Sequence, residues 1–147
     1  MREVTEVAVG VLIDKEGRFL MASRPQGKPY AGWWEFPGGK LEAGEAVTEA
    51  LSREYAEELG VKVKKATPWF VFEREYPHAY VRLHFCRIVD WEGQPQPREG
   101  QTFQWFETLK QAQTEKLLPM CSLVIERLML SDRVALVKTP LSPTVKT

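Results

Sequence analysis

The segment that decides the fold is GGKLEAGEAVTEALSREYAEELGV, which spans residues 38–61. Its second half predicts a helix over residues 46–59, because apolar residues recur there with a helical period. They form one stripe, at Val47, Leu51, Tyr55 and Leu59. Gly60 follows the stripe and is suited to end the helix in a left-handed conformation. The segment therefore predicts a glycine-rich loop that leads into a helix packed on a core.

Three glutamates share this helix, at Glu54, Glu57 and Glu58. Their i, i+3, i+4 spacing makes them neighbours on one helical face, where three carboxylates repel one another. Such a group of oxygens suits a hard divalent cation such as Mg²⁺, which also takes waters and phosphate oxygens as ligands. The alternative is a solvated acidic face, the usual meaning of a run of charges. Glycines at both ends of the segment, and glutamates that flank the apolar stripe, count against this alternative without excluding it.

The same segment is similar to the sequence motif of the Nudix hydrolases, G-x5-E-x7-R-E-U-x-E-E-x-G-U, in which U is an aliphatic residue. Gly39, Glu45 and the dipeptide Arg53-Glu54 occupy its first fixed positions, and residues 57–61 supply the others. The departure is Tyr55, which stands where Leu, Ile or Val is usual. We expect this side chain to face the core, where it would alter the packing without removing the chemical function of the motif.

This resemblance implies an α+β protein with the Nudix fold, in which a mixed β-sheet is sandwiched between α-helices. It also implies hydrolysis of a nucleoside diphosphate linked to another group, with Mg²⁺ or Mn²⁺ as cofactor. Its implied metal ligands are the Gly38 carbonyl and the carboxylates of Glu54, Glu57 and Glu58. Glu54 is also the family's usual candidate for deprotonating water, and Arg53 would pair with Glu45 to orient the carboxylates.

The flanking sequence resembles the MutT-type branch of the family, which acts on the oxidised nucleotide 8-oxo-dGTP. The resemblance lies in residues 34–40, 91–93 and 98–101, and Glu99 in the last of these would be a further metal ligand. The implied substrate-binding residues are Arg24, Phe36, Lys40, Tyr76, Cys121 and Ser122. We therefore expect a pyrophosphohydrolase that converts (oxidised) purine deoxynucleoside triphosphates to a monophosphate and pyrophosphate.

Two positions depart from the MutT-type pattern for reading the base. Cys121 stands where an Asn is usual, and a thiol is a poor substitute for an amide with both donor and acceptor. Ala79 stands where an Arg is usual, so base recognition would depend on Ser122, on backbone groups or on other residues. The alternatives are a Nudix hydrolase of CTP-like pyrimidine nucleotides, nucleotide sugars or dinucleotides. A non-catalytic nucleotide sensor is disfavoured by the intact set of glutamates.

The composition is that of a small globular protein: 147 residues, with twenty Lys and Arg balanced by twenty Asp and Glu. This balance argues against a protein that holds nucleic acid by bulk positive charge, and it is compatible with a small nucleotide. Because the chain has neither an apolar run of membrane length nor an apolar leader, we expect a cytoplasmic protein, as a monomer or homodimer. Its two cysteines, Cys86 and Cys121, are expected to be reduced thiols.

Alternation and turn residues predict strands at residues 4–13, 18–23, 61–76, 80–91 and 101–106. The first two are expected to form a hairpin through a turn at residues 14–17. A second helix is expected at residues 117–130. The predicted organisation is one Nudix domain at residues 1–132 and a loosely ordered tail at residues 133–147.

Overall fold

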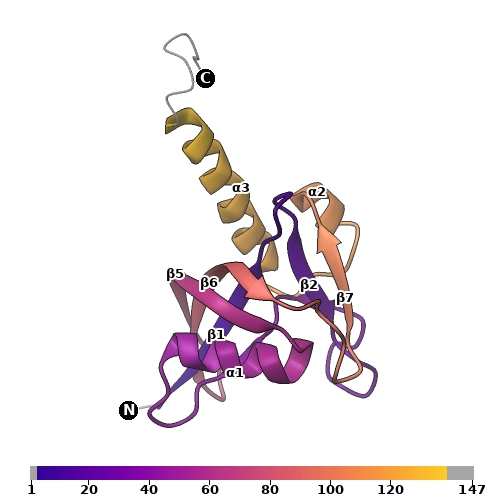
Figure 1. Cartoon of the computed structure of the whole chain (residues 1–147). Coiled ribbons are helices and arrows are strands. Elements are labelled where there is room, and N and C mark those ends of the chain that lie inside the picture. The colour runs from indigo at the N-terminus through magenta and orange to yellow at the C-terminus, as the bar shows by residue number, and fades with distance from the viewer. Residues whose placement is uncertain (1–2, 139–147) are drawn as a thin grey trace.

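The computed structural model describes the backbone of residues 3–138 and the side-chain surroundings of residues 3–130. Along these residues, four strands precede the first helix and three more precede the last two, and the two long helices lie on opposite sides of the strands (Figure 1). The elements are β1 (Val4–Leu12), β2 (Phe19–Ser23), β3 (Trp34–Glu35), β4 (Gly38–Lys40), α1 (Val47–Leu59), β5 (Lys62–Glu75), β6 (Tyr80–Glu92), β7 (Thr102–Phe106), α2 (Leu109–Ala112) and α3 (Cys121–Lys138). The expected α+β class is confirmed.

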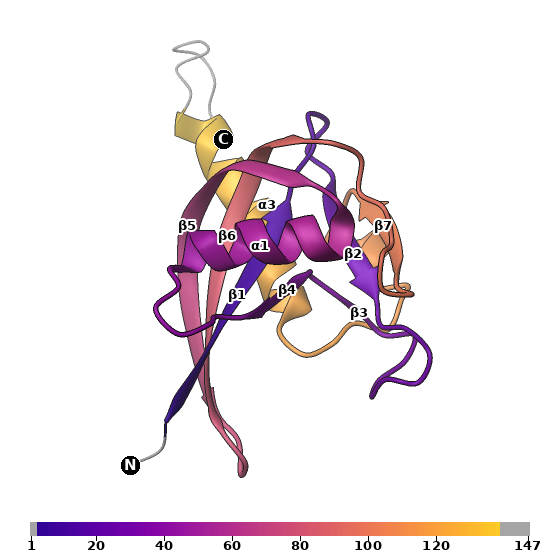
Figure 2. The same cartoon turned by 60° about the horizontal axis from the view of Figure 1, so that its bottom comes forward.

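The larger sheet is mixed and has the strand order β4-β1-β6-β5. Strands β1 and β6 are parallel, with Val4 opposite Tyr80 and Leu12 opposite Ile88, and the other pairs are antiparallel. The long β5–β6 hairpin turns at residues 77–78, as predicted, and its tip extends beyond the rest of the sheet (Figure 2). The short strand β4 carries the glycine-rich loop onto the edge of β1, so the loop is held by sheet hydrogen bonds.

The smaller sheet has the order β3-β2-β7, and the predicted β1–β2 hairpin is wrong. The two strands are joined by the expected turn, in which Gly17 donates its N–H to the Asp14 carbonyl. Beyond it, however, only an isolated bridge between Ile13 and Phe19 connects them. Each strand then enters a different sheet, because β1 pairs with β6 and β4 while β2 pairs with β7 and β3.

Helix α1 covers one face of the larger sheet (Figures 1 and 2). It begins one residue after the predicted start and ends at Leu59, and Gly60 caps it in the left-handed region at φ 71°. Its buried residues are Ala50, Leu51, Tyr55 and Leu59. They pack against the β1 and β6 residues that point to this face, so the acidic side of α1 lies beside the β4 loop.

Helix α3 covers the opposite face of the larger sheet, where Val9 and Val11 of β1 pack against Val124, Ile125 and Leu128. The helix starts at Cys121 and not at residue 117, because Pro119 lies in a turn and Met120 adopts a φ of 84°. It continues through Lys138, beyond the predicted end at residue 130 and across the domain boundary expected at residue 132. The part of the expected tail at residues 139–147 lies outside the described residues.

None of the helices within residues 3–138 combines the length and the apolar character that a membrane-spanning helix needs.

Candidate active site

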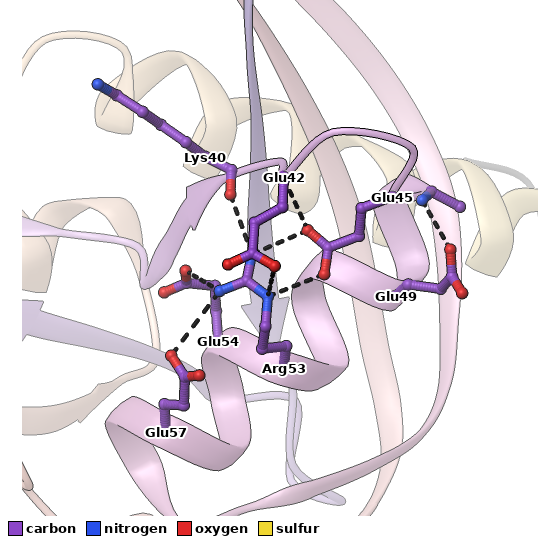
Figure 3. Close-up of polar contacts among 8 residues, drawn as sticks. Lys40, Glu42, Glu45, Glu49, Arg53, Glu54 and Glu57 are labelled. Atoms are coloured by element: carbon purple, nitrogen blue, oxygen red, sulfur yellow. Dashed lines mark hydrogen bonds and ion pairs between the residues drawn. The ribbon is translucent and has the colours of Figure 1, made fainter.

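Arg53 connects the glycine-rich loop to helix α1 (Figure 3). Its Nε and Nη2 donate to the two carboxylate oxygens of Glu45, each at 2.8 Å. Its Nη1 donates to Glu54 Oε1 at 2.7 Å, and Nη2 also donates to the Lys40 carbonyl at 3.1 Å. The Arg53 guanidinium lowers the pKa of Glu45 to about 2, with help from the backbone N–H of Glu42. The pairing expected from the motif is therefore present, and it fixes the loop against the helix.

The loop and the helix touch at Gly39 and Glu54. A Cβ atom added to Gly39 would collide with the Glu54 carboxylate, so a larger residue would displace that side chain from the loop. On the other side of the loop, a Cβ on Gly38 would collide with the Ala8 carbonyl of β1. The dipeptide therefore fits between a strand and the Glu54 carboxylate of α1.

Four further acidic groups surround this contact. Burial of Glu58, its hydrogen bond with Glu54 and the nearby charges of Glu54, Glu99 and Glu35 together raise its pKa to about 9. Glu57 is exposed and lies 3.7 Å from Arg53 Nη1. Because like charges this close repel one another, a divalent cation is the natural counter-charge for the group.

The donor chemistry of the group fits a divalent cation, since carboxylates and backbone carbonyls are the oxygen ligands that Mg²⁺ and Ca²⁺ take. The ligands are not gathered around one point, however: among the side chains that the structure describes, no three acidic, His or Cys residues converge into a ready metal site. Glu54 is engaged by Arg53, and the side chain of Glu57 is 57% exposed. The residues named by the motif are thus assembled on one surface without forming a closed ligand set.

Gln101 holds the loop that carries Glu99. Its Oε1 accepts the backbone N–H of Glu99 at 2.7 Å, and its Nε2 donates to the Glu58 carbonyl at 3.3 Å. Gln101 is also the buried polar residue of the core, with 9% of its surface exposed. It joins the loop to the last turn of α1, and it was not predicted, because a single polar residue before a short strand carries no distinctive signal.

A cavity of about 670 Å³ extends from this acidic surface across the larger sheet. Its acidic lining includes Glu58 and Glu99, beside the loop at residues 38–40. Its apolar lining is formed by side chains of β1, β6, the turn before α3 and the start of α3, namely Val7, Val9, Leu83, Phe85, Leu118, Cys121 and Val124. A cavity lined by both charged and apolar side chains is suited to a molecule that has a charged part and an apolar part.

Three basic residues line the same cavity, and two of them, Arg24 and Lys40, were predicted from the sequence. Arg24 Nη1 donates to Glu35 at 3.2 Å, and its Nε donates to the Pro29 carbonyl at 2.7 Å. The third is Lys28, which comes from the loop between β2 and β3 and was not predicted. Burial raises the pKa of Glu35 while the Arg24 charge opposes the rise. The pair places a cation in the lining of the cavity.

The other predicted substrate residues divide into two groups. Phe36 and Cys121 line the cavity, and both are buried. The Cys121 thiol lies 3.7 Å from the Trp34 carbonyl, and burial raises its pKa to about 12, so it is a neutral group. Tyr76 and Ser122 do not belong to the cavity lining. Tyr76 lies at the tip of the β5–β6 hairpin, where its ring stacks on His78 with 5.4 Å between the centroids.

The sequence matches the family model described as the NUDIX domain over residues 4–121. The chain belongs to this family. It is 36% identical over 106 residues to the 8-oxo-dGTP diphosphatase of Haemophilus influenzae, an alignment that covers 72% of this chain and 78% of that protein. It is also 36% identical over 97 residues to the CTP pyrophosphohydrolase of Escherichia coli, which covers 66% of this chain and 72% of that protein.

Solved structures of MutT proteins have the same fold as this chain. A MutT structure, from work on the enzymes of Aliivibrio salmonicida and Vibrio cholerae, superposes with a TM-score of 0.75 at 26% identity. The match covers 88% of this chain and 99% of that one. The glycine-rich loop, Arg53 and the glutamates of α1 lie within the matched range, so the acidic surface described above is the Nudix motif in three dimensions. The chain is thus a Nudix hydrolase, of a family that uses divalent metal ions.

Proposed function

We propose that this Nudix hydrolase is a MutT-type nucleoside triphosphate pyrophosphohydrolase that uses Mg²⁺ or Mn²⁺. The observation that carries the proposal is the cavity, which is lined both by residues of the motif surface and by apolar side chains. A nucleotide has two matching parts, an anionic phosphate chain and a flat base with apolar faces. Arg24, Lys28 and Lys40 line the cavity and supply positive charge for the phosphates.

The metal would be held by Glu54, Glu57, Glu58, Glu99 and the Gly38 carbonyl. When bound, it supplies positive charge that neutralises the phosphate oxygens, which otherwise repel a nucleophile. Arg53 keeps the carboxylates and the loop in place through its bonds to Glu45 and Glu54. Glu54 is the candidate general base that takes a proton from the attacking water, and the products are a nucleoside monophosphate and pyrophosphate.

The proposed substrate is an oxidised purine deoxynucleotide such as 8-oxo-dGTP, supported by the names of several relatives. A second candidate, a CTP-like pyrimidine nucleotide, is favoured by the chemistry at Cys121. The thiol faces the Trp34 carbonyl and lies in an apolar wall, where it offers a base much weaker hydrogen bonding than an amide does. The enzyme would act on free nucleotides in the cytoplasm, as a monomer or homodimer, without a stable nucleic-acid partner.

A panel of 8-oxo-dGTP, dGTP, dCTP, CTP, ADP-ribose and a nucleotide sugar separates these candidates. We expect the highest kcat/KM on 8-oxo-dGTP. Equal kcat/KM values on dGTP and 8-oxo-dGTP would exclude a preference for the oxidised nucleotide, and preferential hydrolysis of CTP or dCTP would establish the second candidate. Nucleotide binding without turnover at high Mg²⁺ would indicate a sensor.

Single glutamate variants test the proposed metal surface. Each of Glu54→Gln, Glu57→Gln and Glu58→Gln is assayed at saturating Mg²⁺, and loss of a general base at Glu54 should lower kcat by about 100-fold or more. Glu49→Gln is the matched control, because Glu49 lies on the same helix and only accepts the Ala46 N–H at 2.8 Å, which an amide oxygen can also do. Near wild-type turnover in all three variants would contradict the proposal.

A further inference from the structure

Tyr55 replaces the aliphatic residue of the Nudix motif, and its hydroxyl contacts two backbone carbonyls. The residue is fully buried in α1, with 0% of its surface exposed. Its Oη donates to the Gly10 carbonyl at 2.6 Å, and the Pro37 carbonyl also lies within hydrogen-bond distance at 3.2 Å. A buried hydroxyl without partners is costly, so these two carbonyls are what allow a tyrosine at this position. The altered packing expected from the sequence is therefore a specific polar contact.

The side chain also requires a glycine in the facing strand. A Cβ atom added to Gly10 would lie 2.7 Å from Tyr55 Cζ and 2.9 Å from Ile88 Cδ1, and closer still to the hydroxyl itself. Glycine weakens a strand interior, since it loses more backbone entropy on folding than other residues. Gly10 is therefore unfavourable for strand β1, but it leaves room for the tyrosine ring to contact β1 and the loop.

The contact bears directly on the metal surface because Pro37 precedes Gly38. The Pro37 carbonyl accepts the Gly10 N–H at 3.0 Å and lies 3.2 Å from the Tyr55 hydroxyl. A peptide group is planar, so holding this carbonyl also fixes the nitrogen and the Cα of Gly38. Gly38 is also paired with Val9 in the sheet, which further restricts the backbone of the residue that carries the expected ligand.

Tyr55 follows Glu54 on the same helix, and the two side chains contact the loop on either side of Gly38 in the sequence. The Glu54 carboxylate touches Gly39, and the Tyr55 hydroxyl holds Gly10 and Pro37. We propose that Tyr55 is a positioning residue, whose hydroxyl keeps the Gly38 carbonyl in register with the glutamates of α1 for metal binding. The inference rests on the proposed function, since it assigns Tyr55 to the metal site of that reaction.

The experiment compares Tyr55→Phe with Tyr80→Phe in direct Mn²⁺ binding, followed by electron paramagnetic resonance without nucleotide. Tyr80 is the matched control, because its hydroxyl also donates a hydrogen bond, to Glu73 Oε2 at 2.8 Å, but on the β5–β6 hairpin. Groups that orient metal ligands typically contribute 10–100-fold in affinity, so we expect Tyr55→Phe to bind Mn²⁺ about tenfold more weakly. Tyr80→Phe should bind like the wild type.

A second measurement separates positioning from folding. Activity is titrated with Mg²⁺, and we expect Tyr55→Phe to shift the half-saturating concentration while kcat at saturating Mg²⁺ stays within about threefold of the wild type. Circular dichroism shows whether Tyr55→Phe folds. If it does not, Tyr55→Leu, which also lacks the hydroxyl, is tested instead, and the same loss of Mn²⁺ affinity is expected. Mn²⁺ binding of either folded variant equal to that of Tyr80→Phe would overturn the inference. A wild-type protein that binds no Mn²⁺ would overturn the proposed function as well.

Discussion

Replacing Arg53 with lysine keeps the positive charge and removes the fork of nitrogens that joins the loop to α1. The arginine forms two bonds to Glu45, one to Glu54 and one to the Lys40 carbonyl. A lysine ammonium is a single point donor and cannot span these acceptors, which lie on different segments. We therefore expect Arg53→Lys to keep about half of the bonds.

The size of the effect follows from the number of bonds lost. A hydrogen bond to a charged group contributes about 1.5–3 kcal/mol, and two such bonds are lost. Solvent reaches the pair in part, since the side chains are 23% exposed at Arg53 and 13% at Glu45. We therefore expect the free energy of unfolding to fall by about 2–4 kcal/mol. Because the loop and Glu54 lose a common anchor, the half-saturating Mg²⁺ concentration should also rise about tenfold.

The assays are urea denaturation without metal and initial rates across a Mg²⁺ series. Arg18→Lys is the matched control, because Arg18 also pairs with a carboxylate, that of Asp14 at 2.6 Å, in a turn outside the cavity lining. It should change stability by about 1 kcal/mol or less and leave the Mg²⁺ dependence unchanged. If Arg53→Lys behaved like this control in both assays, the reasoning about the arginine anchor would be refuted.

Three further predictions concern packing, base selectivity and pH. Gly10→Ala should lower the free energy of unfolding by about 1–3 kcal/mol in urea, because its methyl group would overlap Tyr55, and an unchanged midpoint would speak against that contact. Cys121→Asn should raise the ratio of kcat/KM for 8-oxo-dGTP over dCTP by about tenfold, since an amide can both donate and accept, and an unaltered ratio would show that residue 121 does not read the base. Glu45 has a pKa of about 2, below its ordinary 4.5, so its ionised form stabilises the fold above about pH 4.5 and this contribution is lost as the pH falls through 2. Acid unfolding of Glu45→Gln, followed by circular dichroism, should therefore be less steep between these pH values, and coincident curves would contradict the Arg53 contact.

The sequence predicted best those elements whose signals are local. Helix α1 could be placed to within one residue because its apolar period, its acidic face and the terminating Gly60 all lie within the segment itself. The β5–β6 hairpin was found for the same reason, since two alternating runs flank the turn at Pro77.

Elements whose partners lie far away in the chain were predicted less well. The strand β1 lies beside β6, about seventy residues further on, and no feature of the turn at residues 14–17 reports that pairing. Strands β3 and β4 contain two and three residues, which is too short to show an alternating period. The start of α3 was misplaced because the apolar residues at 117–118 continue its pattern, whereas the backbone at Met120 breaks it.

The residues of the candidate site also divide into those with a local sequence signal and those without one. The acids and Arg53 could be named from their spacing, because one helix presents them on one face. Glu35, Lys28 and Gln101 come from separate loops and strands, and only the folded chain brings them to the cavity or to its margin. The role of the Tyr55 hydroxyl depends on two carbonyls, at Gly10 and Pro37, that no spacing rule connects to it.

The most direct test of the central claim is identification of the products formed from 8-oxo-dGTP and Mg²⁺ in water enriched in ¹⁸O. Hydrolysis of the kind proposed gives a nucleoside monophosphate and pyrophosphate, with one ¹⁸O atom incorporated per turnover. The wild-type enzyme should form these two products, and Glu49→Gln should form them at a similar rate. Release of a nucleoside diphosphate with orthophosphate, or no turnover on any nucleotide of the panel, would contradict the account.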